Sequence, residues 1–385
     1  MFDIDGVLVH PAGYRRSVEA VMRTIFPQEK IKPILPDELT QAVFEAHQIT
    51  SEWDMVAIST ILTINQISRS DPEIKIPSKV GQFAELEIAK PINPIDYPRF
   101  LSQLNTIEAN GHASERLYQL ILQDRAGIWF TQRLRDSKIM DILLNTRDVF
   151  LSETTSLFQN FCLGSKVFEE TYGLSPKVET KSLLAKFDKP LISADNAKFI
   201  KALMNQNQIN LAVITARPSQ CAAMHTLSCA PEAELALKIA RLPYIPLLGL
   251  GQLEWFAKHK EITVSELLKP SPFHALAAIF AALNFDVMEA MELAWEIIKA
   301  RNSTSGPIKL LNDLCCVIFE DTSSGIKSLQ SAKNILFEKG AQLTTEYYGI
   351  SGNQSKIQAL QAFKAEIFGS TEQAVHHALQ VQGCV

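Results

Sequence analysis

Two aspartates separated by one residue lie at the end of a short apolar stretch near the start of the chain, and they restrict the folds that it can adopt. In a strand, residues i and i+2 project to the same side, so Asp3 and Asp5 can share one site at the strand's carboxyl end. Gly6 then lets the chain leave steeply. One carboxylate can attack a phosphorus atom while the other handles the proton, and both can help to hold Mg²⁺. The alternative is an ordinary Asp-Gly turn after a strand.

The chain from about residue 185 onward alternates short apolar runs with segments of helical spacing. Helices are expected after Asp195, from Ser271-Pro272 with serine as the N-cap, and within residues 284–311. Strands alternating with such helices favour parallel pairing in an α/β layer structure. The four predicted strands are Leu211–Ile214, Tyr244–Leu250, Leu314–Phe319 and, more weakly marked, Asn334–Phe337.

Residues 12–185 have a different pattern. Helical periodicity runs through Trp53–Ile64 and Leu117–Ile121, prolines interrupt the long helical stretches, and no clear strand pattern is present. We therefore expect two domains: an α/β domain made of residues 1–11 and 186–385, and a helical domain of residues 12–185 inserted after its first strand.

Composition excludes several classes of protein. The chain has 37 basic and 42 acidic residues and a net charge of −5, so it lacks the broad basic field that nucleic-acid binding needs. Its pure apolar runs are far shorter than the roughly 20 residues of a membrane span, and its first residues are acidic where a signal peptide would be basic. The six cysteines show no CxxC spacing. We expect a cytoplasmic protein with free thiols and no nucleic-acid or membrane partner; the pattern does not fix its oligomeric state.

Three further residues of chemical interest lie in the α/β part: Thr215, Arg217 and Lys269. Thr215 ends the apolar run Leu211–Ile214, where its hydroxyl and the next backbone N–H, at Ala216, could hold a phosphoryl oxygen. Capping of a helix near Pro218 is the alternative role for Thr215. Lys269 lies just before a predicted helix, where its ammonium could neutralise phosphate charge or could be an ordinary surface lysine. Arg217 could reach a substrate anion or be exposed.

A second pair of acids, Glu320 and Asp321, follows the run Leu314–Phe319 and precedes a turn that contains Gly325. Carboxylates at the end of a strand suit a Mg²⁺ site. The alternative is that Asp321 caps the following helix.

The order of these elements resembles the haloacid dehalogenase superfamily, which consists mostly of phosphatases. Its four motifs are an aspartate pair after an apolar strand, a threonine or serine after a second strand, a lysine, and an acidic pair after a further strand. The resemblance implies a Rossmann-like three-layer parallel-sheet core with an inserted all-α cap domain. The matching positions in this sequence are Asp3 and Asp5, Thr215, Lys269, and Glu320 with Asp321.

The resemblance also implies roles for these residues. Asp3 would be the nucleophile that forms an aspartyl-phosphate, and Asp5 the general acid/base. Thr215, Ala216 and Lys269 would bind the phosphoryl group. Mg²⁺ would lie between the Asp3 carboxylate, the Asp5 backbone carbonyl and Asp321, with Glu320 assisting. The expected activity is Mg²⁺-dependent hydrolysis of a small soluble phosphomonoester, similar to a sugar phosphate or phosphoglycolate. A phosphomutase, or a non-catalytic regulatory protein that binds a phosphate ligand, remains the alternative.

Overall fold

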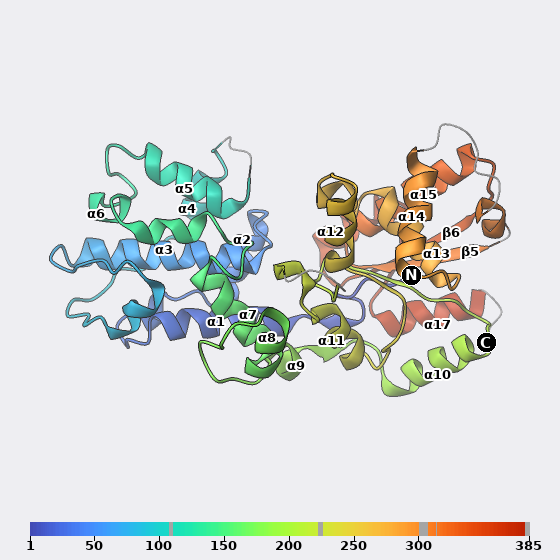
Figure 1. The fold of residues 1–385 in the computed structure, drawn as a ribbon, viewed down its shortest axis with the longest axis horizontal. Helices are drawn as coiled ribbons and strands as arrows, with labels where there is room; N and C mark the ends of the chain where they lie inside the picture. The colour runs from blue at the N-terminus through green and yellow to red at the C-terminus, as the bar shows by residue number, and fades with distance from the viewer. Residues whose placement is uncertain (108–110, 222–225, 300–306, 313, 382–385) are drawn as a thin grey trace. The chain divides into compact units, whose positions relative to one another are not determined.

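The computed structural model describes residues 1–107, 111–221, 226–299, 307–312 and 314–381. The chain divides into two compact units: Met1–Pro11 together with Asp188–Val385, and Ala12–Phe187 (Figure 1). Within the described ranges, no helix combines the length and the apolar character that crossing a membrane requires.

The first unit is built on parallel strands and belongs to the α/β class. Strand β3 (Val213–Ile214) pairs with β4 (Leu247–Leu248), and β5 (Cys315–Glu320) pairs with β6 (Thr344–Ile350), which pairs with β7 (Glu366–Phe368), all in parallel. Phe2 lies between the two groups and makes a parallel bridge to Val213 on one side and to Phe319 on the other. The spatial order is therefore β4, β3, Phe2, β5, β6, β7. A separate antiparallel pair, β1 (Val9–His10) with β2 (Lys189–Pro190), lies beside the unit boundaries.

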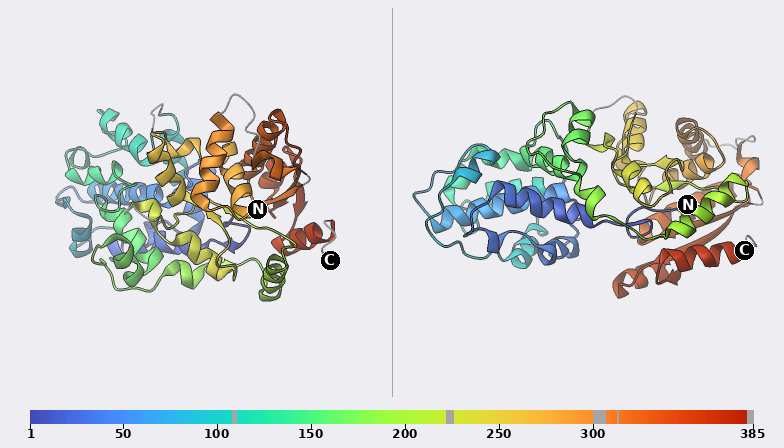
Figure 2. Two further views of the ribbon diagram at one scale, coloured as in Figure 1. Left: turned by 45° about the vertical axis from the view of Figure 1, so that its right-hand side comes forward. Right: turned by 90° about the horizontal axis from the view of Figure 1, so that it is seen from below.

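Helices cover both faces of these strands, because successive strand residues point to opposite sides. Ile214, Leu248 and Ile318 pack into one apolar cluster with helices α12 to α15, and Phe2 and Val213 pack into another with α10, α11 and α17. The right-hand view of Figure 2 shows α17 on one side of the strands and the orange helices on the other. The helices of this unit are α10 (Ala194–Asn205), α11 (Glu232–Ile239), α12 (Leu250–His259), α13 (Pro272–Ala282), α14 (Val287–Lys299), α15 (Ser323–Glu338), α16 (Gln354–Gln361) and α17 (Thr371–Val381).

One predicted strand is wrong, and the parallel strands β6 and β7 and the short pair β1–β2 were not predicted. Asn334–Phe337 forms the last part of α15, whose buried residues Leu329, Ala332 and Leu336 follow helical spacing, while Phe337 is 72% exposed. The adjoining strand is β6, which begins six residues after α15 ends. The start of α13 is as predicted, since the Ser271 hydroxyl accepts a hydrogen bond from the Phe273 N–H and Pro272 is the first helical residue.

The described part of the second unit contains helices and no named strand; a single bridge joins Gly164 to Lys181. Its predicted helices around Trp53–Ile64 and Leu117–Ile121 are α3 and α5. The helices are α1 (Ala12–Ile25), α2 (Glu38–Ala46), α3 (Glu52–Ser70), α4 (Tyr97–Leu104), α5 (Ala113–Gln123), α6 (Gln132–Arg135), α7 (Glu153–Leu163), α8 (Ser165–Tyr172) and α9 (Leu183–Phe187).

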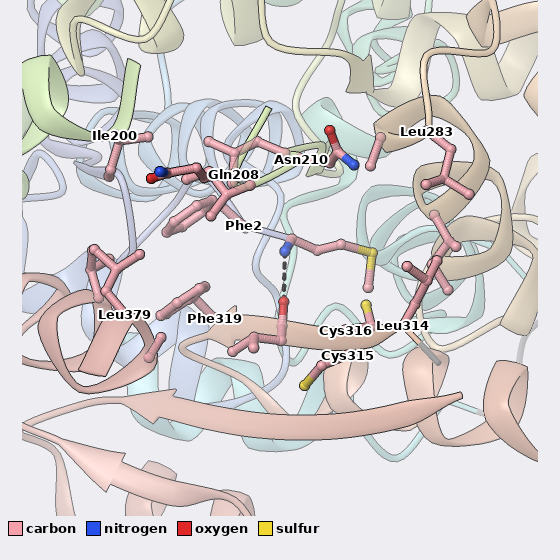
Figure 3. Close-up of a pocket in the computed structure, with 18 of the residues that line it drawn as sticks. Phe2, Ile200, Gln208, Asn210, Leu283, Leu314, Cys315, Cys316, Phe319 and Leu379 are labelled. Carbon is pink, nitrogen blue, oxygen red and sulfur yellow. Dashed lines mark hydrogen bonds between the residues drawn. The ribbon is translucent and has the colours of Figure 1, made fainter. Parts of the chain in front are cut away.

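A cavity of about 330 Å³ lies beside Phe2, at the amino-terminal ends of the strands (Figure 3). Its walls are mostly apolar and come from the start of β5, the segment before β3, and helices α13 and α17. The Met1 backbone nitrogen donates to the Val317 carbonyl at 2.6 Å inside it. Two of its residues are the cysteines Cys315 and Cys316; Cys384 lies outside the described residues.

Candidate active site

The polar residues singled out in the sequence lie at the opposite, carboxyl ends of the strands. Asp3 follows the Phe2 bridges directly, and its backbone N–H donates to the Phe319 carbonyl at 3.0 Å. The chain then turns tightly at Gly6, which has φ of +74° and whose N–H donates to Val9. A turn of this kind after a central strand is where ligand sites form in parallel sheets.

Lys269 joins the two acidic motifs. Its Nζ lies 2.9 Å from Asp3 Oδ1 and 2.6 Å from Glu320 Oε1. The Lys269 side chain is only 8% exposed and that of Glu320 is fully buried, so the interpretation of Lys269 as a solvated surface lysine is wrong. The structure thus brings residues from three separate motifs into direct contact.

Burial and charge shift the pKa values of this group in a consistent way. Burial raises the pKa of Asp3 well above its usual value, and the neighbouring Glu320 raises it further, while Lys269 opposes the shift. Burial alone would lower the pKa of the Lys269 ammonium, but the charges of Asp3 and Glu320 outweigh that effect and raise it. Lys269 therefore remains a cation between these two carboxyl groups.

Two glycines allow the second acidic pair to pack this closely. A Cβ on Gly325 would lie 1.9 Å from Glu320 Oε1, and a Cβ on Gly6 would lie 2.7 Å from Asp321 Oδ2. Glu320 Oε2 also accepts hydrogen bonds from the N–H and the hydroxyl of Thr322. Larger side chains at either glycine would displace the carboxylates.

Asp321 is not the cap of α15, since the N-cap residue is Thr322; instead its carboxylate pairs with Lys356. Burial raises the pKa of Asp321, and Lys356 opposes this shift.

Three carboxylates of the site can reach one cation. Ligand atoms of Asp3, Glu320 and Asp321 all lie within 4.8 Å of one another. This is close to the distance of about 4 Å between opposite oxygen ligands of an octahedral Mg²⁺ ion. The donors are all oxygens, as Mg²⁺ prefers, and a cation would oppose both the burial and the Glu320 charge that raise the pKa of Asp3. The residues therefore fit a Mg²⁺ ion. The Asp5 carboxylate, which was expected to help to hold the metal, is outside this group, and the family resemblance assigns its backbone carbonyl to the metal.

Thr215 lies one strand away, just past β3. Its N–H donates to the Leu248 carbonyl, and its hydroxyl accepts from the Arg217 N–H at 3.1 Å. No helix begins near Pro218 in the described residues, so the capping role is wrong. Ala216 beside it is exposed, which leaves its surface open to a ligand.

Asp5 is bound by an arginine that the sequence left without a clear role. Arg217 Nε lies 2.9 and 3.0 Å from the two Asp5 carboxylate oxygens, and a second nitrogen of the same guanidinium lies 3.0 Å from Asp188. The Arg217 side chain is 2% exposed, so the interpretation of Arg217 as an exposed residue is wrong.

His274 is a residue of the site region that sequence reasoning missed. Its Nδ1 accepts from the Lys269 N–H at 3.3 Å, and its Nε2 donates to the Leu248 carbonyl at 2.8 Å. The imidazole thereby ties the loop that carries Lys269 to the end of β4. Burial lowers the pKa of His274 to about 3, and the nearby charge of Lys269 acts in the same direction. The hydrogen bond to the Leu248 carbonyl opposes this shift. The local sequence offered no signal for this role, since the burial and the contacts of His274 are seen only in the structure.

This histidine predicts a loss of stability in acid. Between about pH 6.5 and pH 3 the unfolded imidazole binds a proton that the folded one does not, so stability falls as the pH falls. The slope is about 1.4 kcal/mol per pH unit, and the whole window of about 3.5 units is worth on the order of 5 kcal/mol. We expect His274→Gln to flatten this dependence in urea unfolding at pH 6.5, 5.5 and 4.5. The exposed His376→Gln is the matched control, and equal slopes in the wild type and His274→Gln would contradict the prediction.

Comparison with known proteins adds information on the fold. No family model matches the sequence, and no curated protein matches it. An X-ray structure of a target of the Northeast Structural Genomics Consortium is similar, with a TM-score of 0.64 over 99% of this chain and 98% of that one, at 14% identity. At this identity the similarity concerns the fold alone, and it extends over both units.

Proposed function

We propose that the protein is a Mg²⁺-dependent phosphatase of the haloacid dehalogenase superfamily, acting on a small soluble phosphomonoester such as a sugar phosphate or a phosphoglycolate-like compound. The single observation that carries the proposal is the contact of Lys269 with both Asp3 and Glu320. A phosphoryl-transfer site needs a nucleophile, a fixed cation and metal-binding carboxylates within reach of one phosphate.

The fold supports the same proposal. Parallel strands with helices packed on both faces suit a Rossmann-like three-layer core, and the helical unit Ala12–Phe187 would be the cap inserted after the first motif. The acids, the threonine and the lysine lie at the carboxyl ends of the strands, where ligands bind in folds of this class.

The chain's own residues can carry out the reaction in two steps. Asp3 attacks the phosphorus atom and forms an aspartyl-phosphate, while protonated Asp5 gives its proton to the departing alkoxide oxygen. Asp5, now a carboxylate, takes a proton from the water that attacks the same phosphorus, and this releases phosphate and frees Asp3. Thr215, the Ala216 N–H and Lys269 would hold the phosphoryl oxygens. Mg²⁺, held by Asp3, Glu320 and Asp321 with the Asp5 carbonyl, would supply positive charge beside the phosphoryl group.

The proposal predicts a requirement for divalent metal. Phosphate release from a panel of phosphate esters should appear with Mg²⁺ and disappear with excess EDTA, because the three clustered carboxylates would repel a phosphate dianion without a cation between them. Asp321→Asn should raise the Mg²⁺ concentration needed for half-maximal activity by about tenfold or more. Asp195→Asn, an exposed acid at the start of α10, is the matched control and should leave it unchanged.

The outcome also separates the alternatives. Undiminished hydrolysis in excess EDTA would contradict the metal requirement. Formation of an isomeric phosphate ester without free phosphate would favour a phosphomutase. Binding of phosphate esters with neither product would favour the regulatory protein.

A further inference from the structure

We infer that Arg217 is a positioning residue, which holds the Asp5 carboxylate in place, and that Asp188 serves as the permanent counter-ion of Arg217. This inference rests on the proposed function and adds to it a residue that the motifs do not assign. It is carried by a juxtaposition of three charged side chains at the carboxyl ends of the strands.

The geometry of Arg217 is that of a fixed support. The guanidinium binds Asp5 through Nε and Nη2, and the same Nη2 also binds Asp188. The Nε–Asp5 distance is 2.9 Å, and the Nη2–Asp188 distance is 3.0 Å. Its backbone N–H also donates to the Thr215 hydroxyl. A planar, forked donor of this kind restricts a carboxylate in both position and rotation, which a lysine ammonium does not.

The two carboxylates differ in burial, and this difference assigns their roles. The Asp188 side chain is fully buried, whereas that of Asp5 is 36% exposed, with Arg217 at 2% beneath it. A buried guanidinium without a counter-ion would be costly. Because Asp188 already supplies one negative charge, Arg217 stays compensated when Asp5 carries a proton, and Asp5 can keep its place beside the guanidinium.

The places of these residues in the chain strengthen the argument. Asp5 lies shortly before the connection into the inserted unit, which follows Pro11, and Asp188 is the first residue after the connection back. By binding both aspartates, Arg217 links the chain near each connection to the end of β3, where the candidate site lies. A residue that served packing alone would not need to bind the general acid/base.

The test separates the two halves of the reaction in the full-length protein with Mg²⁺ and p-nitrophenyl phosphate. This good leaving group needs little protonation, so the burst that phosphorylates Asp3 should stay within about twofold of wild type in Arg217→Lys. Steady-state kcat should fall about 10–100-fold with kcat/KM little changed, and phospho-Asp3 should accumulate, because a displaced Asp5 activates water poorly. Asp188→Asn should give the same signature, and it keeps the test available if Arg217→Lys does not fold.

Two controls make the outcome decisive. Arg217→Lys combined with Asp5→Asn should be no slower than Asp5→Asn alone, since Arg217 acts through Asp5. Arg147→Lys removes an equivalent forked pair, with Asp54 in the helical unit, and should change thermal stability without the burst signature. Three results would overturn the role of Arg217. In Arg217→Lys, these are a burst and a turnover reduced by the same factor, or a turnover equal to that of the wild type. In the double variant, it is a loss of turnover equal to the combined losses of the two single variants. A wild type that never forms phospho-Asp3 would instead overturn the proposed function.

Discussion

Replacing Asp3 with asparagine should abolish turnover and leave the fold intact. The amide is nearly isosteric with the carboxylate but is a poor nucleophile, so we expect a loss of more than about 10⁴-fold in kcat. The buried pair with Lys269 loses its charge, yet Lys269 keeps Glu320 as a partner at 2.6 Å. Phosphate release measures the loss, and circular dichroism with thermal unfolding checks the fold.

The control for this experiment is Asp195→Asn, which removes an exposed acid from the same unit and should keep full activity. Wild-type-like turnover by Asp3→Asn would contradict the assignment of the nucleophile. A phosphorylated peptide from any other part of the chain, found by mass spectrometry after acid quench, would contradict it as well.

Replacing Asp5 with asparagine should separate the two chemical steps. An aspartyl-phosphate should still form from p-nitrophenyl phosphate, because that leaving group needs little protonation. Its breakdown should then stall, since no base activates the water, and turnover should fall about 10²–10⁴-fold. The measurement is a burst of p-nitrophenol followed by acid quench and mass analysis of the Asp3 peptide.

A result without a burst would show that Asp5 is needed already in the first step. Substrates with poor alcohol leaving groups provide the internal comparison, since their phosphorylation step should be slowed in Asp5→Asn as well. Equal losses in the rate of phosphorylation for good and poor leaving groups would contradict a proton-transfer role for Asp5 and favour a purely structural one.

The sequence predicted the α/β class because its strand ends are marked locally. Asp3, Thr215 and Glu320 each follow a short apolar run, and helix starts such as Ser271-Pro272 carry their own capping signal. The ends of parallel strands meet at one edge of a sheet, so residues far apart in the chain could be expected to gather there.

The partners of these residues could not be predicted in the same way. Arg217, Asp188 and His274 gain their roles from contacts across 26 to 212 positions, and nothing in their immediate sequence marks those contacts. Asn334–Phe337 was misread because a short apolar run at the end of a helix has the same composition as a buried strand. Only the spacing of the buried residues over the whole of α15 separates the two.

The position of Phe2 has a consequence for how the first unit opens. Backbone hydrogen bonds around this residue join the strand groups on its two sides. Among them are the bond from the Ile214 N–H to the Phe2 carbonyl and the bond from the Asp3 N–H to the Phe319 carbonyl. The cavity of Figure 3 lies beside Phe2. Where few bonds hold two parts together, they can separate locally without global unfolding. Amide hydrogen exchange at Ile214, Asp3 and Phe319 should therefore be faster than at the centre of the β5–β6 pair. A ligand bound at Asp3 should slow all three together, which makes these amides a reporter of site occupancy that requires no knowledge of the substrate.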